Sequence, residues 1–152
     1  MVPSVWIPDA FFVRRNHHYP KLVINQARAV STDTMHRVRL KNKVDIISFT
    51  ASFYNSLSLA FSEISGRSYG GGVLELMPSE VEQILLPYQK ISQSFLNKID
   101  VMMRNHTPMA QILELTNHEI LHKGFGLSKE DIHTADSIWR KLAQRRLMRN
   151  KA

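Results

Sequence analysis

The stretch from residue 65 to residue 87, SGRSYGGGVLELMPSEVEQILLP, places a helix end, a glycine loop, a strand and a helix start in succession. Gly66 falls where an upstream helical periodicity stops, the usual place for a left-handed terminating residue. Residues 70–72 are three glycines, which allow backbone conformations that other residues avoid. Residues 73–76 read as a strand, and Pro78 opens a short helix. We expect an α+β fold organised around this stretch.

Upstream of the glycines, apolar residues recur at the three- and four-residue spacings of one helical face. This periodicity predicts one continuous helix over residues 45–65. The side chains expected on its apolar face are Phe49, Phe53, Leu57, Phe61 and Ile64. After the helix, a loop is expected to present a cation, a hydroxyl and an aromatic ring, those of Arg67, Ser68 and Tyr69.

The N-terminal part of the chain predicts short strands separated by polar loops. Residues 6–12 are read as an edge strand or an entry segment, with Phe11 and Phe12 in the core. Residues 14–20 form a polar loop with two adjacent histidines, which point in different directions in any regular structure and are expected at the surface. Residues 21–26 have an apolar centre and are expected to form a strand.

The segment 36–40 alternates between two faces, as a half-exposed strand does. Arg37 and Arg39 share the outer face, beside a hydroxyl-rich turn at residues 31–34. Guanidinium groups pair with guanine in the major groove, and hydroxyl groups contact base edges or phosphates. The pattern therefore forms a candidate DNA surface; the alternative is an ordinary strand with solvated arginines.

Charge is distributed unevenly along the 152-residue chain, whose net charge is +7. Residues 14–43 contain eight basic residues and one acidic residue, and residues 138–151 contain six basic residues and no acidic one. Residues 44–137 instead contain six basic and eleven acidic residues. A basic patch attracts polyanions, with counterion release when the polyanion is nucleic acid. The alternative is a solvated basic face with no partner.

Composition excludes several classes of protein. The chain has no cysteine, which excludes a disulfide scaffold and cysteine-ligated zinc or iron–sulfur sites. It has no apolar run long enough to cross a membrane, and its first residues lack the pattern of a secretory signal, so a cytoplasmic protein is expected. The abrupt start, with a tryptophan and two prolines, suggests a segment of a longer protein.

The run NSLSLAFSEISGRSYGGGVLELMPSEVEQILLP resembles the C-terminal part of TaqI-like, adenine-specific DNA methyltransferases of restriction–modification systems. The resemblance extends upstream to residues 8–12, 19–25 and 31–38, and downstream to residues 138–142 and 145–147. It implies the target-recognition part of such an enzyme without its catalytic part. In that family the motif around His36 is a recurrent landmark, so this histidine is equally open to a structural hydrogen-bonding role.

The apolar periodicity of the C-terminal half and this resemblance together predict an organisation and partners. Residues 1–88 are expected to form an α/β target-recognition domain with a small twisted sheet and packed helices. Residues 89–152 are expected to form a helical bundle, with helices over about 89–105, 109–123 and 129–149, that packs on this domain or on the missing N-terminal catalytic domain. The expected partners are double-stranded DNA and that catalytic domain, which would bind S-adenosylmethionine; no cofactor or metal is expected here.

The segment itself is expected to be catalytically silent. No Asn-Pro or Asp-Pro pair occurs, so the loop that polarises a flipped adenine in such enzymes is absent from this sequence. The candidate DNA-binding residues lie in the basic loops 14–20 and 28–39 and in the loop 67–69. They are Arg14, Arg15, Lys21, Arg28, Thr32, Thr34, His36, Arg37, Arg39, Arg67, Ser68 and Tyr69.

Two other motif matches occur in the C-terminal half of the sequence. Residues 118–122, HEILH, fit the H-E-x-x-H zinc motif, but Gly124 and Gly126 end the helix at once and no third ligand follows at a familiar spacing. Residues 119–142 fit a helix-turn-helix, with Ser128 as the cap of the second helix, and give the alternative function of a DNA-binding regulator. The first turn of that second helix carries two carboxylates, which face phosphates badly. An antiparallel helix pair closing a bundle is the preferred interpretation.

Overall fold

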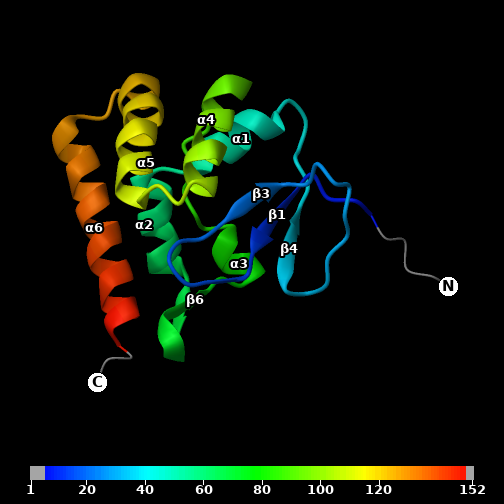
Figure 1. The fold of residues 1–152 in the computed structure, drawn as a ribbon, viewed down its shortest axis with the longest axis horizontal. Helices are drawn as coiled ribbons and strands as arrows, with labels where there is room; N and C mark the ends of the chain where they lie inside the picture. The colour runs from blue at the N-terminus through cyan, green and yellow to red at the C-terminus, as the bar shows by residue number, and fades with distance from the viewer. Residues whose placement is uncertain (1–5, 150–152) are drawn as a thin grey trace.

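The computed structural model describes residues 6–149 and combines two small antiparallel sheets with a set of packed helices (Figure 1). The first sheet has the order β3-β1-β4, and the second has the order β2-β6-β5. The strands of the first sheet are β1 (Ala10–Val13), β3 (Leu22–Ile24) and β4 (Met35–Val38). Those of the second are β2 (Arg15–Asn16), β5 (Arg67–Tyr69) and β6 (Val73–Glu75). The α+β class is confirmed, with two sheets in place of one.

The two sheets join at Arg14, between β1 and β2. Its backbone N–H donates to the carbonyl of Thr34 at 3.4 Å, just before β4, and its own carbonyl accepts from Leu76 N–H at 3.0 Å, just after β6. The segment expected as an edge strand or entry therefore ends in β1, the central strand of the first sheet. Phe11 and Phe12 on this strand are buried, as expected.

The helix expected over residues 45–65 is instead two helices, α1 (Ile46–Phe53) and α2 (Ser56–Ser65). Asn55 caps α2, because its side chain accepts the N–H of Ser58 at 2.9 Å. The break turns Tyr54 toward the outer edge of β3. There its hydroxyl accepts from the Leu22 N–H at 3.0 Å and donates to the Leu22 carbonyl at 2.6 Å, which satisfies an edge that would otherwise be open.

The prediction of which residues form the buried face in the second half of that helix is also wrong. Ile64 is 61% exposed, and Leu57 and Phe61 are only partly buried. The buried face of α2 consists mainly of small side chains, because helix α6 packs closely along it. Its members are Ser56, Ser58, Leu59, Ala60 and Ser62.

The helices after β6 are α3, α4, α5, the π-helical segment η2 and α6. The short helix α3 (Pro78–Val81) begins at the expected proline, and α4 (Gln93–Arg104) follows. Helix α5 (Met109–Thr116) continues directly into η2 (Asn117–Gly124), and α6 (Lys129–Met148) closes the chain. The three helices expected after residue 89 are therefore present.

Two glycine positions decide the geometry of the central turn. Gly66 has φ −80° and ψ 175°, so it is extended and not left-handed as expected. It is required for space, since a Cβ there would lie 2.7 Å from Leu74 Cδ1. The turn η1 (Gly70–Gly72) does need left-handed backbone, with φ 83° at Gly71 and φ 70° at Gly72.

The main core draws side chains from both halves of the chain. Phe12, Leu22 and Phe53 from the first half pack in one cluster with Leu113 and Trp139 from the helical half. The helices after residue 89 therefore pack on the α/β part of this chain. Among the described residues, no helix has the length and apolar character needed to cross a membrane.

Candidate nucleic-acid interface

Arg37 lies on the outer face of β4 and Arg39 follows directly after the strand, and both side chains are exposed. Their guanidinium carbons lie 5.1 Å and 4.3 Å from the centre of the Trp6 ring. A guanidinium over an indole ring is held without losing its charge or its hydrogen-bonding edges. Within residues 6–149, neither arginine forms a salt bridge to a carboxylate. We call Trp6, Arg37 and Arg39 the β4 arginine face.

The turn before β4 adds hydroxyl groups next to this face. Thr32 and Thr34 are exposed, and their Oγ1 atoms lie 3.2 Å apart. Arg28, further back in the same loop, is exposed and has a left-handed φ of 51°. The loop leading into β4 therefore carries one exposed cation and two exposed hydroxyl groups.

His36 lies on the opposite side of β4 from Arg37. The ring is half-buried, its Nε2 lies 2.6 Å from the carbonyl oxygen of Leu76, and it stacks near Phe12 with ring centres 6.5 Å apart. Since Leu76 follows β6, this contact links the two sheets. The geometry gives His36 a structural hydrogen bond, and the inward placement of His36, Val38 and Leu40 confirms the expected alternation.

The second sheet also carries arginines, but these are paired with carboxylates. Arg14 and Arg15 each place Nε 3.0 Å from Oε1 of Glu75, which is buried. The hydrogen bond from Arg15 is the largest influence on the pKa of Glu75 and lowers it from its usual value, against the opposing effect of burial. The pair positions its own strands, because Arg15 lies directly opposite Glu75 across β2 and β6.

Residues 67–69, which were expected on a loop, form the edge strand β5 instead. All three side chains are exposed, so they remain accessible. Arg67 lies opposite Glu75 in the sheet register and places Nε 2.7 Å from Oε1 of Glu80. This hydrogen bond raises the pKa of Arg67 and occupies part of its guanidinium group.

Arg146 on α6 belongs to the basic C-terminal segment, but its side chain is buried. It forms a two-point salt bridge with Glu63 on α2, at 3.0 Å and 2.7 Å, and both side chains are about 3% exposed. Its Nη1 also donates to the carbonyls of His17 and Gly72, which flank β2 and β6. The basic count of the C-terminal segment gave no hint of this. The signal was the helical spacing of Ala135, Trp139, Ala143 and Arg146, all buried on one face.

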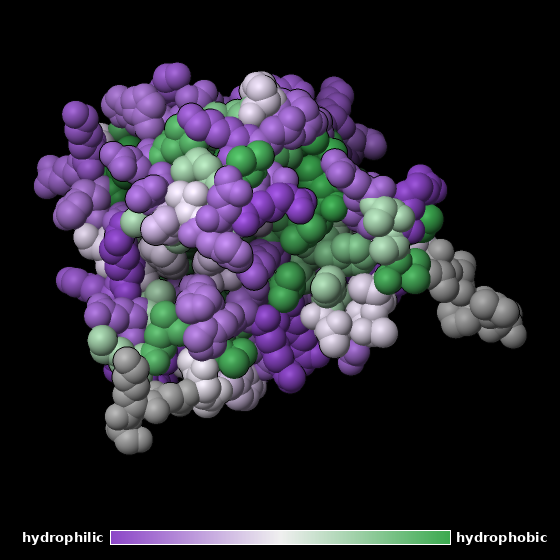
Figure 2. Space-filling view, in the orientation of Figure 1, coloured by the Kyte–Doolittle hydropathy of each residue, from purple (hydrophilic) through white to green (hydrophobic). Residues whose placement is uncertain are grey.

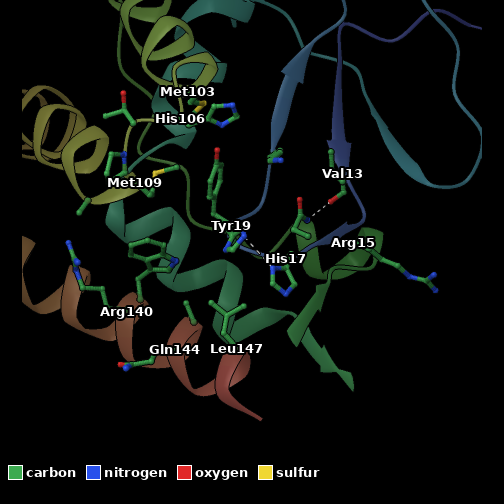
Figure 3. A pocket seen from close by; sticks show the side chains of 18 of the residues that line it. Val13, Arg15, His17, Tyr19, Met103, His106, Met109, Arg140, Gln144 and Leu147 are labelled. Atoms are coloured by element: carbon green, nitrogen blue, oxygen red, sulfur yellow. Dashed lines mark hydrogen bonds between the residues drawn. The ribbon is translucent and has the colours of Figure 1, made fainter. Parts of the chain in front are cut away.

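The loop 14–20 and Lys21 form one wall of a groove of about 1150 Å³ (Figure 3). The other walls come from the α4–α5 connection and from α6. Lys21 is exposed, with Nζ 5.6 Å from the centre of the Tyr19 ring. The structure thus separates the twelve candidate residues into the β4 face with its loop, the second sheet, the groove, and His36 between the sheets.

The zinc-motif residues have contacts of their own. His118 and His122 stack with ring centres 5.5 Å apart, and Nδ1 of His122 lies 2.9 Å from the carbonyl oxygen of Leu127. Glu119 pairs with Lys123 at 3.0 Å. Among residues 6–149, no group of three histidine, aspartate or glutamate side chains could hold a metal ion.

The helix-turn-helix match has the expected cap but an acidic first turn. The Ser128 hydroxyl accepts from the N–H of Asp131 at 3.1 Å, and the Asp131 carboxylate accepts from the N–H of Ser128 at 3.2 Å. Glu130 and Asp131 thus occupy the first turn of α6, while Lys129 and His133 are exposed beside them. Further along, α6 packs against α2.

Helix α6 packs directly against the glycine turn η1. A Cβ at Gly72 would lie 3.3 Å from Leu147, and the Gly72 carbonyl accepts from Arg146. The strands on either side of the turn are antiparallel, whereas cofactor-binding glycine turns connect a strand of a parallel sheet to a helix. The turn therefore does not fit a nucleotide or S-adenosylmethionine loop.

Comparison with known proteins gives one family. The family described as "Type II methyltransferase M.Eco57I, C-terminal domain" matches residues 1–121. The match includes both sheets and ends within η2, so α6 lies beyond it. No curated protein and no solved structure matches the chain.

Proposed function

The chain belongs to the family of the Type II methyltransferase M.Eco57I C-terminal domain, and from this premise we propose that it reads DNA sequence for an adenine-specific methyltransferase. The enzyme would belong to a restriction–modification system. A separate catalytic domain would bind S-adenosylmethionine and flip the target adenine out of the duplex. The present chain would position the duplex and contribute no catalytic group.

The observation that carries the proposal is the β4 arginine face. Arg37 and Arg39 are exposed, lie over Trp6, and have no carboxylate partner among the described residues. An arginine with a free planar edge makes two parallel hydrogen bonds to guanine or to a phosphate. β4 is an edge strand of the three-stranded first sheet, and strands are among the elements that read DNA in a groove.

The second sheet supports a weaker role for its own arginines. Arg14 and Arg15 share Glu75, and Arg67 is held by Glu80, so a DNA contact would compete with an existing ion pair. We therefore expect Arg67 to contribute less to binding than Arg37 or Arg39. The acidic first turn of α6 gives no support for the helix-turn-helix alternative.

Duplex binding by single-alanine variants tests the proposal. Removal of a base contact from Arg37 or Arg39 is expected to cost about 1–3 kcal/mol and to relax one position of the site. Removal of a phosphate contact should weaken all sequences alike and reduce the slope of log K against log salt by about one. Fluorescence anisotropy with duplexes altered at single positions, at several salt concentrations, distinguishes the two effects.

Arg104→Ala is the matched control, because Arg104 is an exposed arginine on α4, away from the β4 face. It should leave affinity and salt dependence close to those of the unaltered chain. If Arg37→Ala and Arg39→Ala behave like this control, the proposed recognition surface is wrong. If Lys129→Ala and His133→Ala are the sensitive variants instead, the helix-turn-helix function replaces it.

A further inference from the structure

The groove beside the loop 14–20 combines cations, rings and an apolar floor. In Figure 3, Arg15, His17 and Tyr19 lie on one side, Arg140, Gln144 and Leu147 lie on the other, and Met103, His106 and Met109 close the end. The face of the molecule seen in the orientation of Figure 1 is mostly hydrophilic and is interrupted by apolar patches (Figure 2). The residues that line the groove include cations, aromatic rings and apolar side chains, so the groove differs from a simple hydrophobic docking site.

The described lining of the groove has positive groups but no carboxylate. Arg15 and Arg140 are held from outside the lining, by Glu75 and Asp136 respectively. Lys21 has no ion-pair partner among the described residues, and three histidines, at positions 17, 18 and 106, add hydrogen-bonding rings. A ligand that enters this groove meets donors and cations, so an anionic ligand is favoured.

The floor suits a flat apolar group rather than a second charge. Met103, Met109 and Leu147 line it together with Trp139, which is 8% exposed. The Trp139 Nε1–H is buried and has no hydrogen-bond partner among the described atoms, which is unusual in a folded protein. A groove lined by cations together with aromatic rings and methionines matches the chemistry of a nucleotide.

We infer that this groove holds one unpaired DNA strand, with a phosphate at Lys21 and a base between the histidine rings and the floor. The inference rests on the proposed function, because flipping the target base out of a duplex leaves its partner nucleotide unpaired and free to enter a groove. The volume of the groove, about 1150 Å³, is slightly above the range of ~300–1,000 Å³ typical of small-molecule pockets. That size accommodates part of one strand and not a duplex.

The chain offers a separate fluorescent reporter for each surface. It has two tryptophans, of which Trp6 lies on the β4 arginine face and Trp139 lines the groove. The Trp6→Phe variant therefore reports on the groove, and the Trp139→Phe variant reports on the β4 face. Each is titrated with oligothymidylate, which does not pair with itself, with duplex DNA, and with polyglutamate as an acidic peptide.

We expect oligothymidylate to change the Trp139 signal saturably and duplex DNA to change the Trp6 signal. His106→Asn removes a ring while tolerating the left-handed φ of 56°, and it should weaken strand binding about five-fold or more. Lys21→Ala should lower the salt slope of strand binding by about 0.7. The matched controls His133→Asn and Lys98→Ala lie outside the groove and should leave strand binding unchanged.

The outcomes separate this inference from the proposed function. If oligothymidylate leaves the Trp139 fluorescence unchanged while duplex DNA changes the Trp6 fluorescence, the groove assignment is overturned and the β4 arginine face is retained. A responsive Trp139 with a silent Trp6 supports the groove and removes the main support for duplex recognition by β4. Polyglutamate that changes Trp139 as strongly as oligothymidylate shows a site for acidic peptides, and this also overturns the strand assignment.

Discussion

The two sheets carry arginines in similar number but leave them in different electrostatic states. In the first sheet, Arg37 and Arg39 rest on Trp6 and face solvent. In the second sheet, Arg14 and Arg15 converge on Glu75, and Arg67 pairs with Glu80. Positive charge is thus available for a ligand on one sheet and is used for cohesion on the other.

The difference follows from which parts of the chain build each sheet. All strands of the first sheet come from residues 10–38, within or next to the basic segment. The second sheet pairs β2 from that segment with β5 and β6 from the acidic middle of the chain. Among the described residues, the basic residues near the N-terminus are therefore neutralised by carboxylates only in the second sheet, where the basic and the acidic segments pair.

The largest expected effect concerns the anchor of the second sheet. Arg146→Met leaves Glu63 buried without a counter-charge and removes the donor to the carbonyls of His17 and Gly72. Breaking a buried ion pair in this way costs about 3–5 kcal/mol. Urea unfolding should show this loss, and hydrogen exchange at Leu74 on β6 should accelerate more than at Phe12 on β1.

Arg145→Met is the matched control, since Arg145 is exposed on the same helix, and it should change stability by less than about 0.5 kcal/mol. The double variant Glu63→Met with Arg146→Met should recover much of the loss, because an apolar pair replaces a buried ion pair at little cost. Equal stability of Arg146→Met and Arg145→Met would show that α6 does not anchor the second sheet.

A smaller effect is expected at the edge of the first sheet. Tyr54→Phe removes the hydroxyl that pairs with both the N–H and the carbonyl of Leu22 in a buried position. Leaving these groups unpaired should cost about 1–3 kcal/mol. Tyr88→Phe is the control, because its hydroxyl contacts Asp45 in a partly exposed position. A loss of exchange protection in the second sheet rather than in β3 would contradict this assignment.

The smallest effect is a pH dependence at Glu75. Its pKa is lowered in the fold, so its ionised form contributes stability above the unfolded glutamate pKa of about 4.3. This contribution is lost as pH falls through the lower native value. Unfolding midpoints of the unaltered chain and of Glu75→Gln should therefore differ at pH 7 and converge in acid.

The same Glu75→Gln variant bears on binding. It frees Arg14 and Arg15 from their shared carboxylate, so the second sheet should come to resemble the first and duplex affinity should rise modestly. A stability difference that does not change with pH, or an affinity that falls, would show that Glu75 acts by shape rather than by charge.

The features that the sequence predicted depend on near neighbours. The alternation of residues 36–40 and the cap at Ser128 are visible within a few positions, and the structure contains both. The partner of Arg14 lies 61 residues away, so no local pattern shows that this arginine is paired. The break between α1 and α2 had a local signal, Asn55 three residues before Ser58, but the longer apolar periodicity concealed it.

Two buried serines of α2, Ser56 and Ser58, form hydrogen bonds to other parts of the chain. Ser56 Oγ donates to Asp136 on α6 at 3.0 Å and accepts from Asn117 Nδ2 at 2.8 Å, while Ser58 Oγ donates to the carbonyl of Leu85 at 2.8 Å. A purely aliphatic face could slide by one helical turn against α6 and keep most of its burial. Here such a slip would break the hydrogen bond from Ser56 to Asp136 and the salt bridge between Glu63 and Arg146, so a single alignment of α2 and α6 is selected over its near neighbours.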